Sequence, residues 1–125
     1  MEQDQSLMNS NNAPAQLTFL CHMVNPSPSL FKMEFILSYN ISTQKIEVVE
    51  RDKNRKWRAG KSFVPCTSAK KLSERDFVPG RIVQLSQWKF YLIEGDEVTT
   101  EYLKEKALKE GRDFDHELST NQNQF

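Results

Sequence analysis

Residues 51–61, RDKNRKWRAGK, are the part of this sequence best suited to binding chemistry. Six basic side chains and one acid fall within eleven positions, and Trp57 lies near the middle. Clustered cations attract an acidic partner, and tryptophan is enriched at the strongest contacts of protein interfaces. We predict that this stretch binds an acidic partner, the alternative being a solvated loop whose tryptophan folds back on the domain. The predicted contact residues are Arg51, Lys53, Arg55, Lys56, Trp57, Arg58 and Lys61.

The acids and the Cys-His pair do not make a convincing catalytic or metal site. Glu94, Asp96 and Glu97 lack the ligand spacing of a calcium loop, and they precede a predicted helix, whose N-terminus favours acids. Cys21 and His22 supply only two ligands where zinc needs three or four. We therefore expect no enzyme activity, no metal or other cofactor, and no small-molecule substrate.

Length, composition and charge limit the remaining classes of function. A chain of 125 residues with 38% hydrophobic content forms one domain with a modest core. Seven Lys or Arg between residues 45 and 61 are balanced by an acidic stretch after residue 94, and the net charge is zero. Nucleic-acid binding depends mainly on neutralising phosphates, so this balance argues against a nucleic-acid partner.

The N-terminal sequence and the apolar runs indicate an intracellular protein. MEQDQSLMNSNNAPAQ has no apolar signal-peptide core, and LTFLCHMV is far too short to span a bilayer. We expect no membrane span. In a reducing compartment Cys21 and Cys66 are expected to be buried and reduced.

The elements that must position the basic stretch are mostly strands. Residues 17–24 form an apolar run, and residues 31–39 alternate, with Phe31, Met33, Phe35, Leu37 and Tyr39 on one face. Residues 45–51 alternate as a third strand, after the turn NISTQ, so the basic charges begin where this strand ends. SFV is expected to form a further short strand before Pro65.

The second half of the chain predicts a turn, a hairpin and a helix. Pro79 and Gly80 suit the central positions of a type II turn, and residues 81–85 and 88–93 form a hairpin about Ser86 and Gln87. From Asp96 the period becomes helical, and Gly111 follows the helix. The expected buried stripe is Val98, Tyr102, Leu103 and Ala107.

Polar tails flank this predicted domain. Residues 1–16 and 111–125 are rich in Asn, Gln, Ser and acids, and have little to bury, so we expect them to be disordered alone. Phe125 is a candidate anchor that becomes ordered on binding, the alternative being a merely exposed side chain.

Residues 17–110, the predicted domain, resemble the DM-ten domain family. The resemblance is carried in order by LTFLCH, EFILSYN, IEVVER, ERDFVPGRIVQL and WKFYLIEGDEVTTEYL. The family occurs in EF-hand proteins of ciliary doublet microtubules and in an axonemal relative of nucleoside diphosphate kinase. The resemblance implies a mainly β fold, a pleckstrin-homology-like bent antiparallel barrel closed by a C-terminal helix. This chain looks like a solitary domain of that kind.

The resemblance also implies a function and partners. It suggests a non-enzymatic structural protein of the ciliary or flagellar axoneme, located in the cytoplasm and cytoskeleton. The implied partners are alpha/beta tubulin and neighbouring microtubule inner proteins. Tubulin is acidic, which suits the basic stretch. The alternative is a pleckstrin-homology-like module that binds anionic lipid headgroups or acidic peptides through residues 51–61.

Overall fold

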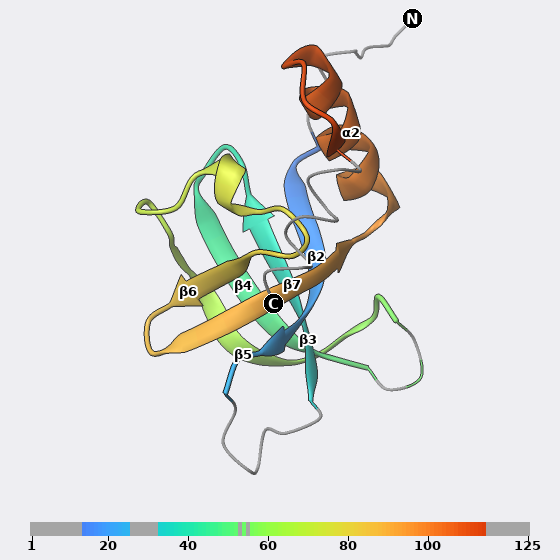
Figure 1. Cartoon of the computed structure of the whole chain (residues 1–125). Coiled ribbons are helices and arrows are strands. Elements are labelled where there is room, and N and C mark those ends of the chain that lie inside the picture. Colours follow the sequence, from blue (N-terminus) through green and yellow to red (C-terminus); the bar gives the residue numbers. More distant parts are fainter. Residues whose placement is uncertain (1–13, 26–32, 53, 55, 115–125) are drawn as a thin grey trace, which may run out of the picture.

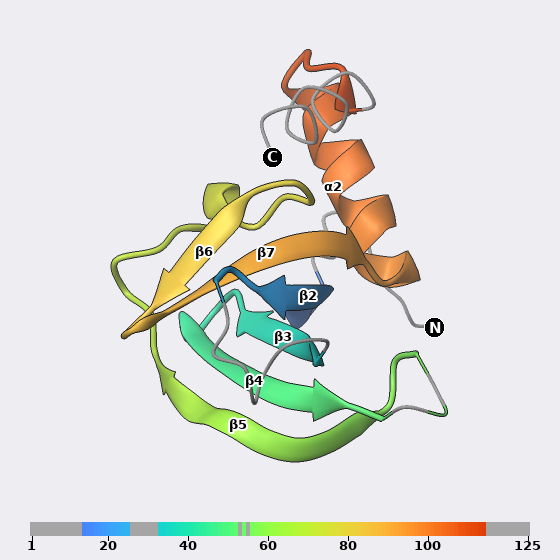
Figure 2. The ribbon, with the colours of Figure 1, turned by 60° about the horizontal axis from the view of Figure 1, so that its bottom comes forward.

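The computed structural model describes residues 14–25, 33–52, 54 and 56–114, which form a curled antiparallel sheet and one α-helix (Figure 1). The strand order is β5-β4-β3-β2-β7-β6, and all five neighbouring pairs are antiparallel. Figure 2 shows the sheet bent into a half-barrel, with β5 and β6 as its two edges. The predicted mainly β class is confirmed. The elements are β2 (Gln16–Met23), β3 (Glu34–Asn40), β4 (Lys45–Arg51), β5 (Ala59–Ser68), β6 (Ile82–Leu85), β7 (Trp88–Gly95) and α2 (Glu97–Lys109).

The strand predicted from the apolar run at residues 17–24 is present as β2, and the period-two pattern of the next two predicted strands is confirmed. Phe35, Leu37 and Tyr39 of β3 are buried, as is Ile46 of β4, because they face the inside of the half-barrel. Residues 41–44 form the predicted turn. Phe31, at the start of the predicted second strand, lies outside the described residues.

The strand predicted at residues 62–64 is present, but its predicted end before Pro65 is wrong, because β5 is ten residues long and runs through this proline. Val64 pairs with Val48 and Thr67 pairs with Ile46, so two residues of β5 stand opposite one residue of β4. Proline is tolerated at such a bulge and on an edge strand, where its missing N–H breaks no ladder bond. Pairing with β4 therefore continues the strand beyond Pro65, where the sequence alone predicts its end.

The two predicted tight turns are confirmed. Gly80 has φ 94°, and the Arg81 N–H donates to the Val78 carbonyl oxygen at 3.1 Å, as a type II turn requires. Leu85 pairs directly with Trp88, which leaves a two-residue hairpin loop between β6 and β7.

The predicted limits of the helix are also confirmed, but its predicted buried stripe is partly wrong. Asp96 caps α2 by accepting from the Thr99 N–H at 2.9 Å, and Gly111 has φ 71° just beyond the end. Leu103 and Ala107 are buried as expected, whereas Val98 is 60% exposed. Thr99, next to Val98, is 1% exposed and takes the inward position.

Thr99 faces inward because its hydroxyl completes the hydrogen bonding of β2. The Thr18 N–H donates to Thr99 Oγ1 at 2.8 Å, and the Thr18 carbonyl accepts from the Asp96 N–H at 3.0 Å. The first turn of α2 thus continues the ladder where β7 ends. A Cβ on Gly95 would stand 2.8 Å from Thr99 Cγ2, so this junction requires glycine.

A second contact holds the middle of α2 to the short 3-10 turn η2 (Glu74–Asp76). Lys106 Nζ donates to Glu74 Oε1 at 2.8 Å, and the Tyr102 hydroxyl donates to the same carboxylate. Partial burial, reinforced by this hydrogen bond to Glu74, raises the pKa of Tyr102. Tyr102 packs against the core, as expected of a helix-to-barrel contact.

The core contains residues from beyond the sheet. Phe77, in the connection between β5 and β6, is fully buried and stacks on Tyr39 with ring centroids 4.2 Å apart. Phe114, which follows the helix, is also buried. Cys21 is buried as expected, but Cys66 is exposed, because it lies in the bulged part of an edge strand.

Some predictions concern residues outside the described part of the chain. Most of the predicted tails, 1–13 and 115–125, including Phe125, lie there. Among the described residues, no helix has both the length and the apolar character needed to cross a bilayer.

Candidate functional site

The only acid of the basic stretch, Asp52, organises the loop that follows β4. We call residues 52–58 the basic loop. The Asp52 carboxylate accepts from the Asn54 N–H at 2.8 Å and lies 3.4 Å from Arg58 Nε. The Asp52 N–H donates to the Arg58 carbonyl oxygen at 2.8 Å, which closes the base of the loop. Two predicted contact residues, Lys53 and Arg55, lie outside the described residues.

A side chain of the basic loop reaches across to β7. Lys56 Nζ lies 2.6 Å from Glu94 Oε1 on β7, so the loop reaches past β3 and β2. Glu94 pairs with Leu20, and Leu20 pairs with Ile36. Both apolar side chains belong to the outer face yet are only 5–6% exposed.

The other described basic side chains of the stretch differ in their contacts: two are ion-paired and one is exposed without an ion pair. Arg51 NH2 lies 2.6 Å from Glu34 Oε1, and Arg58 pairs with Asp52. Lys61 belongs to β5, where it is exposed and has no ion pair among the described residues. Three of the predicted contact cations therefore already have a carboxylate partner. Lys56 and Arg58 are exposed in their pairs, and exposed pairs contribute about 1 kcal/mol or less each, so a partner's carboxylates can replace the internal ones at these two positions.

Trp57 forms one wall of a groove of about 300 Å³ on the outer face of the sheet. We call it the sheet-face groove. It lies between the basic loop and the start of α2, and Trp57 is 37% exposed at its side. The groove is lined by Gln16, Thr18, Ile36, Ser38, Glu47, Val49, Trp57, Ala59 and Asp96.

Strand register explains why these residues meet. Glu47 pairs with Ser38, and Ser38 pairs with Thr18, which gives a polar row across β4, β3 and β2. The adjacent outward row contains Val49 paired with Ile36, which gives an apolar row beside the polar one. Side chains two residues apart on a strand share a face, so both rows lie on the outer face of the sheet, where Glu47 is exposed and Ile36 is buried.

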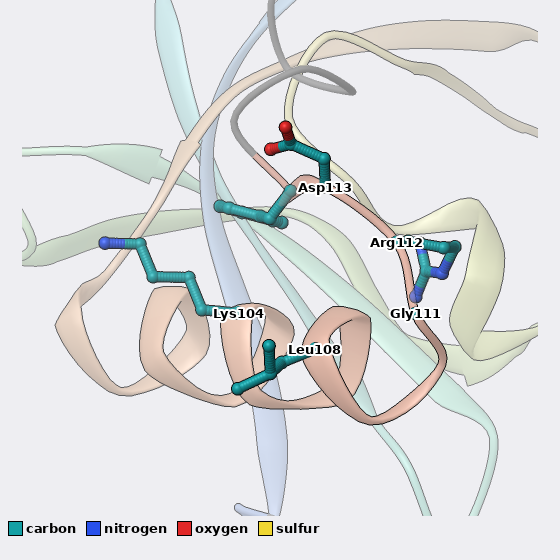
Figure 3. A pocket seen from close by; sticks show the side chains of 6 residues that line it. Lys104, Leu108, Gly111, Arg112 and Asp113 are labelled. Carbon is teal, nitrogen blue, oxygen red and sulfur yellow. The ribbon is translucent and has the colours of Figure 1, made fainter.

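A second, wider hollow lies at the C-terminal end of α2, and we call it the helix-end hollow (Figure 3). Its volume is about 620 Å³. Lys104 and Leu108 enter it from the helix, and Asp113 comes from the segment that follows (Figure 3). Its lining includes one carboxylate, Asp113, and two basic side chains, Lys104 and Arg112. Its lining ends at Phe114, the last residue that the structure describes, so the sheet-face groove is the better defined site.

The predicted non-catalytic acids have structural contacts. Glu94 binds Lys56 and Asp96 caps α2. His22 lies on the outer face of β2 with its ring 5.2 Å from that of Tyr91, whereas Cys21 faces the core. In the residues that the structure describes, no group of three or more His, Cys, Asp or Glu is placed to hold a metal ion.

Sequence reasoning identified Trp57 but missed its groove. The sequence indicates a strand over residues 45–51 and a helix start at Asp96, but it gives no sign that Glu47 and Asp96 lie at the same groove. Asp52 stands out in the sequence only as the one acid of the basic stretch, although it shapes the loop. One local signal was available for Asp52. An Asp side chain often accepts a hydrogen bond from the backbone N–H two residues later, which here is that of Asn54.

Comparison with known proteins adds no relative to these observations. No protein-family model matches the chain, and no curated protein matches it.

Proposed function

We propose that this chain is a non-enzymatic structural component of the ciliary or flagellar axoneme. In this proposal it binds tubulin inside doublet microtubules, as a microtubule inner protein, and stabilises their wall. The observation that carries the proposal is the segment WKFYLIEGDEVTTEYL, residues 88–103, which resembles the DM-ten family. In the folded chain this segment is β7, the Asp96 cap and the first half of α2. The proposal includes a pleckstrin-homology-like identity for the curled sheet and helix.

The cations of the basic loop can exchange their internal carboxylate partners for those of an acidic protein, which supports the proposal. The side chains of Lys56 and Arg58 are 49% and 62% exposed even in their ion pairs. Lys61 adds a third exposed charge on the adjoining strand. Because exposed pairs are weak and screened, the acidic surface of tubulin can compete for these cations. Trp57 beside them supplies the aromatic contact typical of an interface.

The second candidate is binding of anionic lipid headgroups or acidic peptides through the same loop. The exposed Lys61 favours it, but the internal pairing of Arg51, Lys56 and Arg58 lowers the charge that a small headgroup would meet. We therefore rank it second. Co-sedimentation with vesicles that contain anionic lipid, compared with neutral vesicles, separates it from tubulin binding.

The test is extraction from axonemes with rising salt. A tagged chain is expressed in ciliated cells, and its release is compared with that of K56E/R58E/K61E. The matched control K70E/K71E/K104E reverses three exposed lysines outside the loop. We expect the full chain in the axonemal fraction, and release of the loop variant at lower salt than either the wild type or the control.

The axonemal proposal is tested by where the chain is found in the cell and by the density inside the doublet wall. Cryo-electron microscopy of doublets from cells with and without the chain is expected to show a density difference inside the doublet wall. Wild-type chain that is recovered only in the soluble fraction, with no such density difference, would refute the axonemal function. Equal release of the loop variant and its control would refute the role of the basic loop alone.

A further inference from the structure

The sheet-face groove has a charge opposite to that of the basic loop beside it. Its nine lining residues include two carboxylates, Glu47 and Asp96, and no lysine or arginine. Trp57 forms a wall, and Ile36 and Val49 supply apolar surface. Carboxylates next to an aromatic ring attract a cation, whereas they repel an acidic ligand.

Both carboxylates are positioned by the fold. Glu47 projects from the polar row of the sheet and is exposed. One oxygen of Asp96, Oδ1, accepts from the Thr99 N–H at 2.9 Å, and this bond fixes the carboxylate at the start of α2. In the described part of the chain no hydrogen bond or ion pair uses Oδ2 of Asp96, so this oxygen can accept from a ligand.

The neighbouring Lys56 does not cancel this negative charge. Its ammonium lies 2.6 Å from Glu94, which compensates it. The same ammonium lies 5.9 Å from the centroid of the Trp57 ring, within the range of a cation–π contact. Trp57 thus makes a cation–π contact within the chain itself.

We propose that the sheet-face groove binds the side chain of a lysine or arginine in an extended segment of a partner protein. The charged head group lies between Glu47 and Asp96, and the aliphatic stem packs on Trp57 and the apolar row. A volume of about 300 Å³ is at the lower end for small-molecule pockets, and it suits one side chain better than a drug-sized ligand. This contact goes beyond the tubulin proposal, because it pairs an acidic groove with a basic partner.

Capped pentapeptides test the proposal with the purified full-length chain. The central residue is lysine, arginine, norleucine or glutamate, flanked by glycine and serine, and binding is followed by NMR. We expect the lysine and arginine peptides to shift the Trp57 indole N–H and the amides of Thr18 and Ser38. We expect affinity about tenfold higher than for the norleucine peptide, which corresponds to about 1.4 kcal/mol. Equal binding of the norleucine peptide, or tighter binding of the glutamate peptide, would overturn the proposal.

Matched variants test whether the lysine peptide binds at the groove. E47Q/D96N removes both charges with near-isosteric amides, and asparagine caps a helix as well as aspartate does. We expect this variant to bind the lysine peptide at least about fivefold more weakly than wild type. E101Q/E105Q makes the same charge change at exposed helix positions outside the groove, and we expect wild-type affinity.

The two variants also separate this proposal from the axonemal one. If E47Q/D96N, folded as judged by its circular dichroism spectrum, binds the lysine peptide as tightly as E101Q/E105Q does, the groove is not the site and the proposal is overturned. Because only purified protein and peptides are used, the outcome is independent of whether the chain enters an axoneme.

Discussion

Replacing Thr99 with valine tests the joint between α2 and the sheet. Valine keeps the shape and the β-branching of threonine but removes Oγ1, the acceptor for the Thr18 N–H at 2.8 Å. No other described group is bonded to this N–H, since β7 ends at Gly95. The variant therefore leaves a backbone donor without its partner at a partly buried position.

The expected loss follows from the burial of this bond. A buried donor left without a partner costs about 1–3 kcal/mol, and this bond is part-buried, so we expect about 1–2 kcal/mol. For a domain of this size that corresponds to a decrease in Tm of roughly 5 °C or more. Thr100→Val is the control, because the Thr100 hydroxyl makes only a longer bond, 3.3 Å, to the Gly95 carbonyl.

Chemical denaturation followed by circular dichroism measures the free energy of unfolding. Hydrogen exchange gives a second, more local measurement, because loss of the acceptor should remove protection of the Thr18 amide in particular. Thr99→Ser retains the hydroxyl and should retain that protection, although it loses a buried methyl group. The reasoning is refuted if Thr99→Val leaves Thr18 protected and the protein as stable as Thr100→Val.

Two further predictions concern titratable groups. Cys66 should react with a thiol reagent in the native protein, whereas burial raises the pKa of Cys21 and should delay its reaction until unfolding; equal rates for both thiols would contradict this. The raised pKa of Tyr102 means that its contribution to stability is present below about pH 10 and is lost as the pH rises through the folded pKa. A difference absorbance titration against Tyr102→Phe should show this late ionisation, and Glu74→Gln should shift it to lower pH.

The sequence predicted those parts of the fold that depend on local signals. The alternation around Phe35 identifies a strand by itself, and the Pro79-Gly80 pair specifies its turn through backbone conformation. The helix limits follow in the same way from Asp96 and Gly111. These signals act within a few residues, so no knowledge of the tertiary structure is needed to interpret them.

The errors concern residues whose environment is set by distant partners. β5 continues past Pro65 because β4 supplies a ladder that accepts a bulge. Val98 is more apolar than Thr99, but Thr99 turns inward because a strand 81 positions earlier in the chain needs its hydroxyl. Hydrophobicity alone cannot represent such a hydrogen-bond requirement.

The candidate site was only half predictable for the same reason. Trp57 is conspicuous in a charged segment, so its type and neighbours identify it. Glu47 and Asp96 join it only through the pairing of β4 with β3, of β3 with β2 and of β2 with β7. A shift of one residue in that register would move Glu47 to the opposite face, and the groove would lose its charge.

The place of β2 between β3 and β7 has a consequence for synthesis on the ribosome. Its partner β3 begins 11 positions after β2 ends at Met23, but β7 begins at Trp88, 65 positions after that end. At 5–20 residues per second this interval lasts roughly 3–13 seconds. During that time one side of β2 has its pairing groups exposed, as an edge strand does. The nascent chain is therefore most vulnerable to mispairing before its last strand emerges, and this is the interval in which a chaperone would protect it.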